Sequence, residues 1–125
     1  MITKIPGSNT EHYKWGNGCE GWHLLKTDSL NMIKERMPPG TSEQLHYHVY
    51  AQQVFYILSG KATFELDGEL IDVNKDESLV IPKGVKHKVA NEEKEDLIFL
   101  LISEPRAQND RMNLLFKIKS GQHLR

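Results

Sequence analysis

Cysteine is nearly absent from this sequence. Cys19 is the single cysteine among 125 residues, so no internal disulfide can form. Disulfides are rare in the cytoplasm, where thiols are kept reduced. We therefore expect a cytoplasmic protein.

The chain also lacks an excess of charge and a long hydrophobic run. Sixteen lysines and arginines face seventeen aspartates and glutamates, for a net charge of −1. No segment approaches the roughly 18 consecutive apolar residues of a transmembrane helix. Residues 1–9 lack the apolar run of a secretion signal. We therefore expect no nucleic-acid partner and no membrane partner.

What is present is the balance of one globular domain. Apolar residues make up 38% of the chain and charged residues 26%, which is ordinary for a folded protein and unlike a disordered one. A chain of this length can bury a hydrophobic core but has no room for a second functional domain.

Short apolar runs, separated by turn residues at intervals of about eight to twelve positions, follow one another along most of the chain. This spacing predicts an all-β sandwich or barrel. Asp67-Gly68, between two such runs, is the strongest hairpin signal. The predicted strands are 22–27, 30–37, 44–48, 54–58, 61–66, 69–73, 78–81, 86–91 and 97–103.

Two of these runs, 54–58 and 97–102, are apolar on both faces. An antiparallel strand with one solvated face should alternate between apolar and polar residues. Either the rest of the domain or another subunit must therefore cover the second face. In so small a domain we favour a homodimer.

The whole chain, 1–125, is interpreted as a single domain with a core at about 22–103. The N-terminal extension 1–21 is polar, and the C-terminal extension 104–125 is polar before it offers one more strand or a short helix at 112–118. We expect both extensions to pack on the barrel or at the dimer interface.

Two histidines lie one residue apart in a predicted strand. The strand period of two places His46 and His48 on one face, with Cα atoms about 6.6 Å apart. His87 lies in another predicted strand, and Gln53 heads the strand after His48. Imidazole nitrogens suit zinc, copper, iron and nickel, and an amide oxygen is a candidate fourth ligand.

A His-x-His pair alone is a weak signal, since such pairs often belong to a polar surface. The surrounding residues strengthen it. Gly40 precedes His46 with five residues between them, and Gly60 follows Gln53 with six residues between them. Further along the chain comes the pattern Pro82-x-Gly84-x2-His87-x3-Asn91. This order resembles the two motifs of the cupin superfamily, Gly-x5-His-x-His-x3–4-Glu-x6-Gly and Gly-x5-Pro-x-Gly-x2-His-x3-Asn. The resemblance covers residues 30–103.

The resemblance implies a small jelly-roll β-barrel, also called a double-stranded β-helix, with one copy of the motif pair and a tendency to form dimers. It also implies a divalent transition metal held by His46, His48 and His87, with zinc, iron, manganese, nickel and copper all open. Two positions depart from the motifs. Gln53 stands in place of the glutamate, and Asp76 stands in place of a turn glycine, which matters less because aspartate tolerates turn conformations.

The glutamine has electrostatic consequences. Three neutral imidazoles and an amide leave the full charge of +2 on the metal, which should favour anionic ligands such as enolates and carboxylates and should weaken metal affinity. Gln53 either ligates the metal through its carbonyl oxygen or lies near the metal without binding it, which leaves coordination positions open for water, substrate or O₂. In a third reading, the site has lost its metal.

Four further residues are candidates for a substrate pocket: Arg36, Gln44, Phe55 and Ile57. Arg36 could hold a carboxylate or phosphate, although a surface arginine is commoner. Gln44 shares the strand parity of His46, and Phe55 and Ile57 share that of Gln53, where barrel core is the simpler role. His12, His23 and His123 have no partner spacing and are expected at the surface, and Asn91 is expected to be structural.

The sequence assigns no catalytic residue. Glu35 and Glu43 are the nearest carboxylates, and Glu43 has the wrong parity to share the face of His46. The leading hypothesis is a small metalloenzyme, of dioxygenase or isomerase type, that acts on a small oxygenated metabolite. The alternatives are a binding module for a sugar or similar metabolite, and a dimeric structural protein whose metal only staples the barrel.

Overall fold

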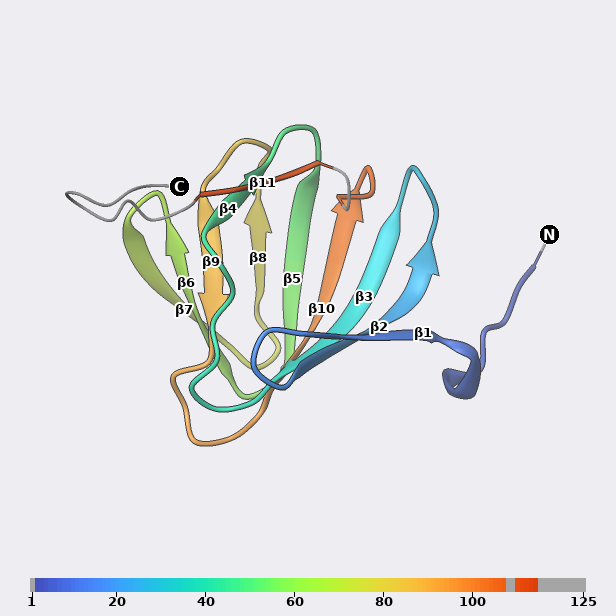
Figure 1. Ribbon diagram of the computed structural model, residues 1–125, viewed down its shortest axis with the longest axis horizontal. Coiled ribbons are helices and arrows are strands. Elements are labelled where there is room, and N and C mark those ends of the chain that lie inside the picture. The colour runs from blue at the N-terminus through green and yellow to red at the C-terminus, as the bar shows by residue number, and fades with distance from the viewer. Residues whose placement is uncertain (1, 108–109, 115–125) are drawn as a thin grey trace.

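The computed structural model describes residues 2–107 and 110–114 and is almost entirely β-structure (Figure 1). Strands make up 57% of it and helix 3%, in two antiparallel sheets. The prediction of an all-β jelly-roll barrel is therefore confirmed. In the described residues no helix is long and apolar enough to cross a membrane.

The larger sheet contains six strands in the order β1-β2-β3-β10-β5-β8. Their bounds are β1 Glu11–Trp15, β2 Cys19–Lys26, β3 Asn31–Met37, β10 Leu97–Glu104, β5 Gln52–Ser59 and β8 Ser78–Ile81. The smaller sheet contains five, in the order β11-β4-β9-β6-β7. Their bounds are β11 Arg111–Asn113, β4 His46–His48, β9 His87–Ala90, β6 Lys61–Leu66 and β7 Glu69–Asn74, and a short 3₁₀ turn, η1, spans Gly7–Asn9.

Each strand predicted between 22 and 103 is present, with bounds that mostly agree to within one or two residues. β4 begins at His46 instead of residue 44, and β2 begins at Cys19. β1 lies inside the segment 1–21 that was treated as an extension, and it pairs with β2 along its whole length. β11 overlaps the start of the predicted element 112–118, whose part after residue 114 lies outside the described residues.

The turn between β6 and β7 confirms the predicted hairpin. Asp67 and Gly68 both have positive φ angles, 47° and 90°, as a two-residue hairpin turn of this kind requires. Asp76 also has a positive φ, 68°. An aspartate therefore occupies the left-handed conformation at the position where the resemblance led us to expect glycine.

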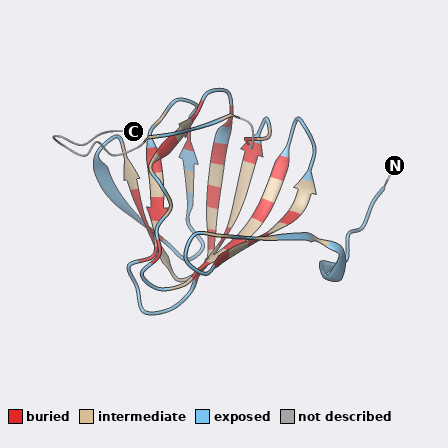
Figure 2. Ribbon diagram, viewed as in Figure 1, coloured by how far each residue is buried: buried red, intermediate tan, exposed pale blue. Residues whose placement is uncertain are grey.

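The hydrophobic core fills the space between the two sheets. Figure 2 shows buried residues recurring as bands along the central strands, because every second side chain points inward. Phe55 of the larger sheet lies 4.9 Å from Phe64 of the smaller sheet and 5.3 Å from Phe99, between ring centroids. Fully burying an aromatic or aliphatic side chain contributes about 1.5–3 kcal/mol, so the contact of Phe55 with Phe64 helps to hold the two sheets together.

Strand register in the larger sheet arranges the inward side chains in rows that cross β3, β10 and β5. One row is polar and consists of Asn31, Ser103 and Gln53, and the next is apolar and consists of Ile33, Leu101 and Phe55. Glu35 belongs to the third row, where it pairs with Phe99. A polar end and an apolar middle are thus built into the interior surface of this sheet.

The outer face of the larger sheet carries the apolar residues that broke the alternation rule. Val54, Tyr56 and Leu58 on β5 are half-buried, as are Ile98 and Leu100 on β10. The described residues leave this face partly exposed. The apolar character of both faces is therefore real.

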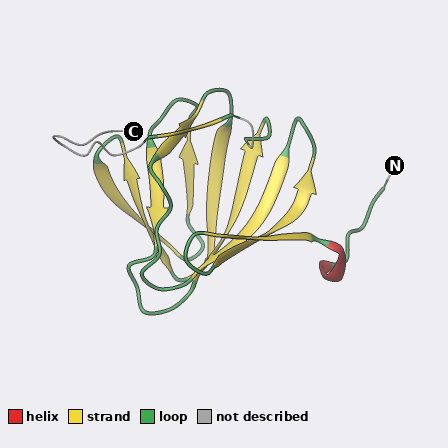
Figure 3. Cartoon of the chain, in the orientation of Figure 1, coloured by secondary structure: helices red, strands yellow, loops and turns green. Residues whose placement is uncertain are grey.

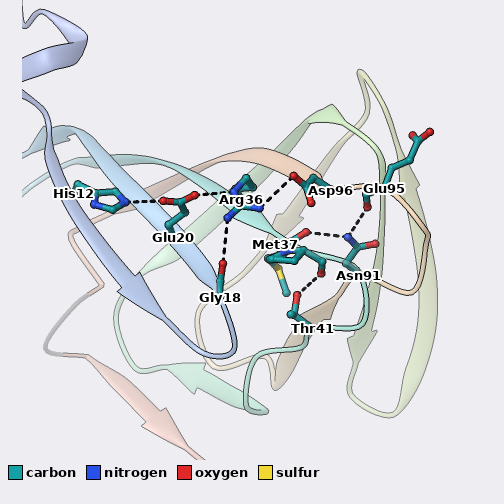
Figure 4. A network of polar contacts seen from close by, with 10 residues as sticks. His12, Gly18, Glu20, Arg36, Met37, Thr41, Asn91, Glu95 and Asp96 are labelled. Carbon is teal, nitrogen blue, oxygen red and sulfur yellow. Dashed lines mark hydrogen bonds and ion pairs between the residues drawn. The ribbon is translucent and has the colours of Figure 1, made fainter.

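One ion-pair network crosses the edge of this outer face (Figure 4). Arg36 donates to Glu20 at 2.7 Å and to Asp96 at 3.2 Å, and also to the carbonyl of Gly18 at 3.2 Å. These bonds join β2, β3 and the loop before β10. Arg36 therefore points outward and does not line the interior, as its even position on β3 dictates.

Asn91 has a structural role at the bottom of the barrel. Its side chain is fully buried and donates to the carbonyls of Met37 at 2.9 Å and Glu95 at 2.8 Å (Figure 4), and it accepts from the amide of Glu93 at 3.0 Å. It ties the loop after β9 to the end of β3.

Two turn glycines allow a matched test of backbone constraint. Gly60 has a φ of 85°, and a Cβ there would lie 2.7 Å from the carbonyl oxygen of Asp96. Gly68 has a φ of 90° with open space around it. We expect Gly68→Ala to destabilise the protein by about 1 kcal/mol and Gly60→Ala by about 3 kcal/mol or more, as measured by urea unfolding. Equal losses would contradict the clash at Gly60.

Candidate metal centre and its pocket

Three buried histidines converge inside the barrel. His46 and His48 project from β4 and His87 from β9, where His46 and His87 are direct cross-strand partners. The three rings are at most 5% exposed. Their candidate ligand atoms all lie within 4.8 Å of one another, which is close enough for one ion.

Backbone carbonyls fix the orientation of two of these rings. The Nδ1 atoms of His46 and His87 lie 2.8 Å from the carbonyl oxygens of Gln44 and Val85, in each case two residues earlier. A carbonyl oxygen can only accept, so both Nδ1 atoms carry the proton and both Nε2 atoms keep a free lone pair. The Nε2 atom of His87 is buried and has no hydrogen-bond partner among residues 2–107 and 110–114. This is the arrangement that metal-ligating histidines adopt.

The surroundings keep the rings neutral. Burial, and then the charge of Arg111, lower the pKa of His46 to about 3. Burial, and then His87, lower the pKa of His48 to about 4, and burial also lowers the pKa of His87. Neutral imidazole is the form that binds a metal, so at neutral pH all three rings can serve as ligands.

Gln53 of β5 presents an unused acceptor. Its Nε2 atom donates to Ser103 Oγ at 2.9 Å, while its Oε1 atom is buried and has no partner in the part of the chain that the structure describes. Three neutral imidazoles and an unpaired amide oxygen fit a divalent transition metal. The structure thus leaves both readings of Gln53, ligand and close neighbour, compatible with a metal.

The centre opens into a pocket of about 380 Å³, within the range of small-molecule sites. His46, His48 and Gln53 line it together with Phe55, and its remaining lining consists of Tyr13, Trp15, Asn31, Ile33, Glu35, Glu43, Leu101, Ser103, Ala107 and Arg111. The pocket therefore joins a nitrogen-rich wall to apolar side chains and to two carboxyl groups.

Glu43 lies beside the histidines, so the parity argument that set it apart is wrong. Its Oε1 atom is 4.0 Å from His46 Nδ1 and accepts from the amide of Val89 at 3.2 Å, and its Oε2 atom is 3.8 Å from Arg111. Parity applies within a strand, whereas β4 begins only at His46. Burial raises the pKa of Glu43 to about 8.

Glu35 is the second carboxyl group of the pocket. It lies on the inward face of β3 and accepts a hydrogen bond from the hydroxyl of Tyr13. Burial raises the pKa of Glu35 to about 7. The pocket therefore contains both carboxyl groups that the sequence analysis named without assigning them a role, and burial raises the pKa of each.

The other predicted pocket residues lie at different places. Phe55 lines the pocket, whereas Ile57 is fully buried in the core. The side chain of Gln44 reaches the carbonyl of Leu114 at 3.4 Å, and its backbone carbonyl holds His46. Together with the outward Arg36, these positions show that the pocket follows the first two rows of β3, β10 and β5 and takes only Glu35 from the third row.

Both the N-terminal and the C-terminal extension contribute residues to the pocket. Tyr13 and Trp15 come from β1 and Arg111 from β11. The alternation of Glu11-His-Tyr-Lys-Trp was a weak signal for β1, since it places both aromatic residues on one face. His23, expected at the surface, is instead 7% exposed, with its ring 5.2 Å from that of Tyr13.

Asp110 fixes the approach to β11. Its carboxylate accepts hydrogen bonds from the backbone amides of Val49 at 2.7 Å, Tyr50 at 3.0 Å and Ala51 at 2.9 Å. These bonds lower its pKa against the opposing effect of burial. They clamp the loop after His48 and bring the neighbouring Arg111 to the pocket.

Comparison with known proteins places this architecture among described families. A family model described as "Cupin domain" matches residues 33–103. An uncharacterised protein of Methanocaldococcus jannaschii is 30% identical over 93 residues, which are 74% of each chain. A Thermotoga maritima protein named oxalate-binding protein is 27% identical over 106 residues, which cover 80% of this chain and 88% of the relative.

Solved structures share the fold. A predicted oxalate decarboxylase from Thermotoga maritima has a TM-score of 0.72 at 24% identity and covers 83% of this chain and 100% of its own. The polyketide cyclase RemF from Streptomyces resistomycificus has a TM-score of 0.79 at 16% identity, over 94% of this chain and 89% of its own. At these identities the likeness extends to the fold alone.

The raised pKa of Glu35 predicts a pH-dependent stability difference. The folded protein holds the Glu35 proton more tightly than the unfolded chain, because the pKa rises from 4.5 to about 7. The free energy of unfolding therefore falls as pH rises from 4.5 to about 7, because the unfolded chain loses the Glu35 proton before the folded protein does. In the metal-free protein, Glu35→Gln should match the native stability near pH 4 and exceed it by about 3 kcal/mol at pH 8.

Urea unfolding at both pH values measures the difference, and Glu69→Gln, an exposed position on β7, serves as the control. A Glu35→Gln difference that is equal at the two pH values would contradict the burial of an ionisable Glu35.

Proposed function

This chain belongs to the cupin family, and from that premise we propose that it is a metal-dependent enzyme acting on a small oxygenated metabolite. The single observation that carries the proposal is the buried set of three neutral histidines, oriented by backbone carbonyls and opening into a pocket of about 380 Å³. His46, His48 and His87 would hold a divalent transition metal, with Gln53 beside them.

The pocket is suited to an anionic oxygen ligand. A bound metal supplies positive charge that attracts carboxylate or enolate oxygens and stabilises negative charge on them. No carboxylate stands among the four candidate ligands, so that charge is not offset within the set. Arg111 adds a cation to the lining, partly balanced by Glu43 at 3.8 Å.

Of the two reaction types, isomerase and dioxygenase, the pocket favours the first. An isomerase that moves a hydrogen needs groups that accept and return a proton near neutral pH. Burial raises the pKa values of Glu35 and Glu43 to about 7 and about 8, which suits both groups to that task. If the metal-loaded protein consumed O₂ in the presence of a substrate, the reaction would instead be of the dioxygenase type.

A second candidate function is binding of a small dicarboxylate without turnover. The name of the Thermotoga relative, an oxalate-binding protein, favours it. A purely structural metal would instead be closed to added ligands. Calorimetric titration of the metal-loaded protein with oxalate separates these cases, because an open centre binds the anion and a closed one does not.

Metal analysis tests the proposed centre directly. We expect chelator-free, untagged protein to carry about one transition metal per chain, and His48→Ala to lose it. His12→Ala, which removes an exposed histidine on β1, is the matched control and should keep the metal. Absence of metal from the native protein, even after reconstitution with each candidate ion, would contradict the proposal.

Gln53 allows its own prediction. Gln53→Glu supplies the missing negative charge, and we expect it to tighten metal binding by about 10-fold or more while weakening oxalate binding. Gln53→Ala should weaken metal binding if the amide oxygen is a ligand, and it should leave metal binding unchanged if the amide does not bind the metal. Competition with a chelator measures the affinities, and equal affinity in all three proteins would contradict any electrostatic role for this position.

We further propose a homodimer in the cytoplasm, formed through the outer face of the larger sheet. The half-buried apolar side chains of β5 and β10 support this interface. Leu100→Lys, at the centre of that face, should convert a dimer into a monomer in light scattering. Leu70→Lys, which replaces an exposed leucine of the smaller sheet, should not. A native monomer would contradict this part of the proposal.

A further inference from the structure

Tyr13, Gly21 and Glu35 form one row across the edge of the larger sheet. Tyr13 of β1 pairs with Gly21 of β2, and Gly21 pairs with Glu35 of β3. The phenol hydroxyl donates to the Glu35 carboxyl group, across the intervening strand. Both side chains line the same pocket as His46 and Gln53.

Gly21 makes this contact sterically possible. A Cβ atom at Gly21 would lie no farther than 2.7 Å from three atoms of the Tyr13 side chain, including its hydroxyl oxygen. Real Cβ atoms do not approach other atoms this closely. The phenol therefore lies in the space that a side chain at Gly21 would fill, and any other residue there would push it away from Glu35.

The surroundings suit Glu35 to exchange a proton while Tyr13 keeps its own. Burial is the main cause that raises the pKa of both groups, and Glu35 adds to the rise at Tyr13. The groups that face Glu35 are Tyr13 on β1, Glu43 before β4 and Arg111 on β11, with His23 of β2 beside the Tyr13 ring. A carboxyl group that titrates near neutral pH works as both base and acid.

We propose that Glu35 is the catalytic base and acid of this pocket and that Tyr13, admitted by Gly21, is its positioning residue. The substrate class is a carbonyl compound with a hydrogen on the carbon next to the carbonyl, such as an α-keto acid. This inference rests on the proposed function, in which the histidine centre holds the oxygen atoms of the substrate.

The proton transfer is balanced without a further reactant. A Glu35 oxygen takes the proton as the C–H bond breaks, and the electron pair of that bond forms a carbon–carbon double bond while the carbonyl oxygen becomes negative. Glu35 then returns the proton to carbon or delivers it to oxygen. The apolar row of Ile33, Leu101 and Phe55, which lines the pocket, would hold the carbon skeleton.

Phenylpyruvate is a suitable probe, because it combines two adjacent oxygen functions, an exchangeable methylene and an apolar ring. Proton NMR in D₂O measures exchange of the methylene hydrogens by metal-loaded protein, and calorimetry measures phenylpyruvate binding. The proteins are native, Glu35→Gln, Tyr13→Phe and Gly21→Ala, with Glu69→Gln as the exposed control.

We expect Glu35→Gln to bind metal and phenylpyruvate within about twofold of native and to exchange hydrogens about 100-fold or more slowly. Tyr13→Phe and Gly21→Ala should slow exchange less and move the pH midpoint of the rate upward, because both remove a hydrogen bond that lowers the pKa of Glu35. The control should match native.

A second readout needs no activity and no metal. In the metal-free protein, carbon-13 NMR of the Glu35 carboxyl group should give a midpoint near 7, and Tyr13→Phe and Gly21→Ala should both raise it. A purely structural Tyr13 would leave this midpoint unchanged, and that result would overturn its assigned role.

The outcomes separate this inference from the proposed function. Native protein that holds metal and binds phenylpyruvate but does not exchange its hydrogens, or a Glu35→Gln variant that exchanges as fast as native, overturns the inference and leaves the metal centre standing. Loss of exchange in Glu43→Gln but not in Glu35→Gln overturns it as well. Native protein that takes up no metal overturns both.

Discussion

Three imidazole rings buried between two sheets are the constraint on which the rest of this structure depends. Buried polar groups must find partners, and within the described residues only two of the six nitrogens of these rings have a hydrogen-bond partner. The carbonyls of Gln44 and Val85 satisfy the Nδ1 atoms of His46 and His87, while the Nδ1 atom of His48 and the Nε2 atom of His87 have no partner among the described residues. Burial holds the rings neutral at neutral pH. The lone pairs of their unprotonated nitrogens are therefore available to a metal cation and are not taken up by protons. The pairing of β4 with β9 sets this convergence.

The remaining pocket chemistry follows from the same interior. Register aligns a polar row, an apolar row and Glu35 on one wall, and the irregular segment before β4 brings Glu43 to the other. Desolvation raises the pKa values of both carboxyl groups, whereas it lowers those of the histidines. Burial therefore leaves the imidazole rings in the neutral form that can bind a metal, and it leaves the two carboxyl groups protonated up to near neutral pH. This combination suits the movement of a hydrogen in a substrate better than either feature alone.

Local patterns in the sequence were sufficient for most of the fold. Alternation, turn residues and motif spacing identified the strands between 22 and 103, the Asp67-Gly68 hairpin and the histidine cluster. They did not identify β1, and they left the element that overlaps β11 open as a strand or a short helix, because nothing in a short polar strand specifies which sheet edge it will join. Strand parity misplaced Glu43, since the backbone between Gly40 and His46 is tied to β9 by isolated contacts at Ser42 and Glu43 and is not a strand. The contact of Tyr13 with Glu35 depends on Gly21, whose strand β2 lies between β1 and β3. Strand order in the folded sheet brings these three residues into one row, and their spacing along the sequence does not reveal it.

X-ray absorption spectroscopy of the metal-reconstituted protein tests the central claim most directly, because it counts the ligands of the metal itself. The account predicts three imidazole nitrogens at about 2.0–2.1 Å if the metal is zinc, with the remaining positions filled by oxygen, and a signal that loses one imidazole in His87→Ala. A coordination shell without imidazole, or one that is unchanged in His87→Ala, would contradict it.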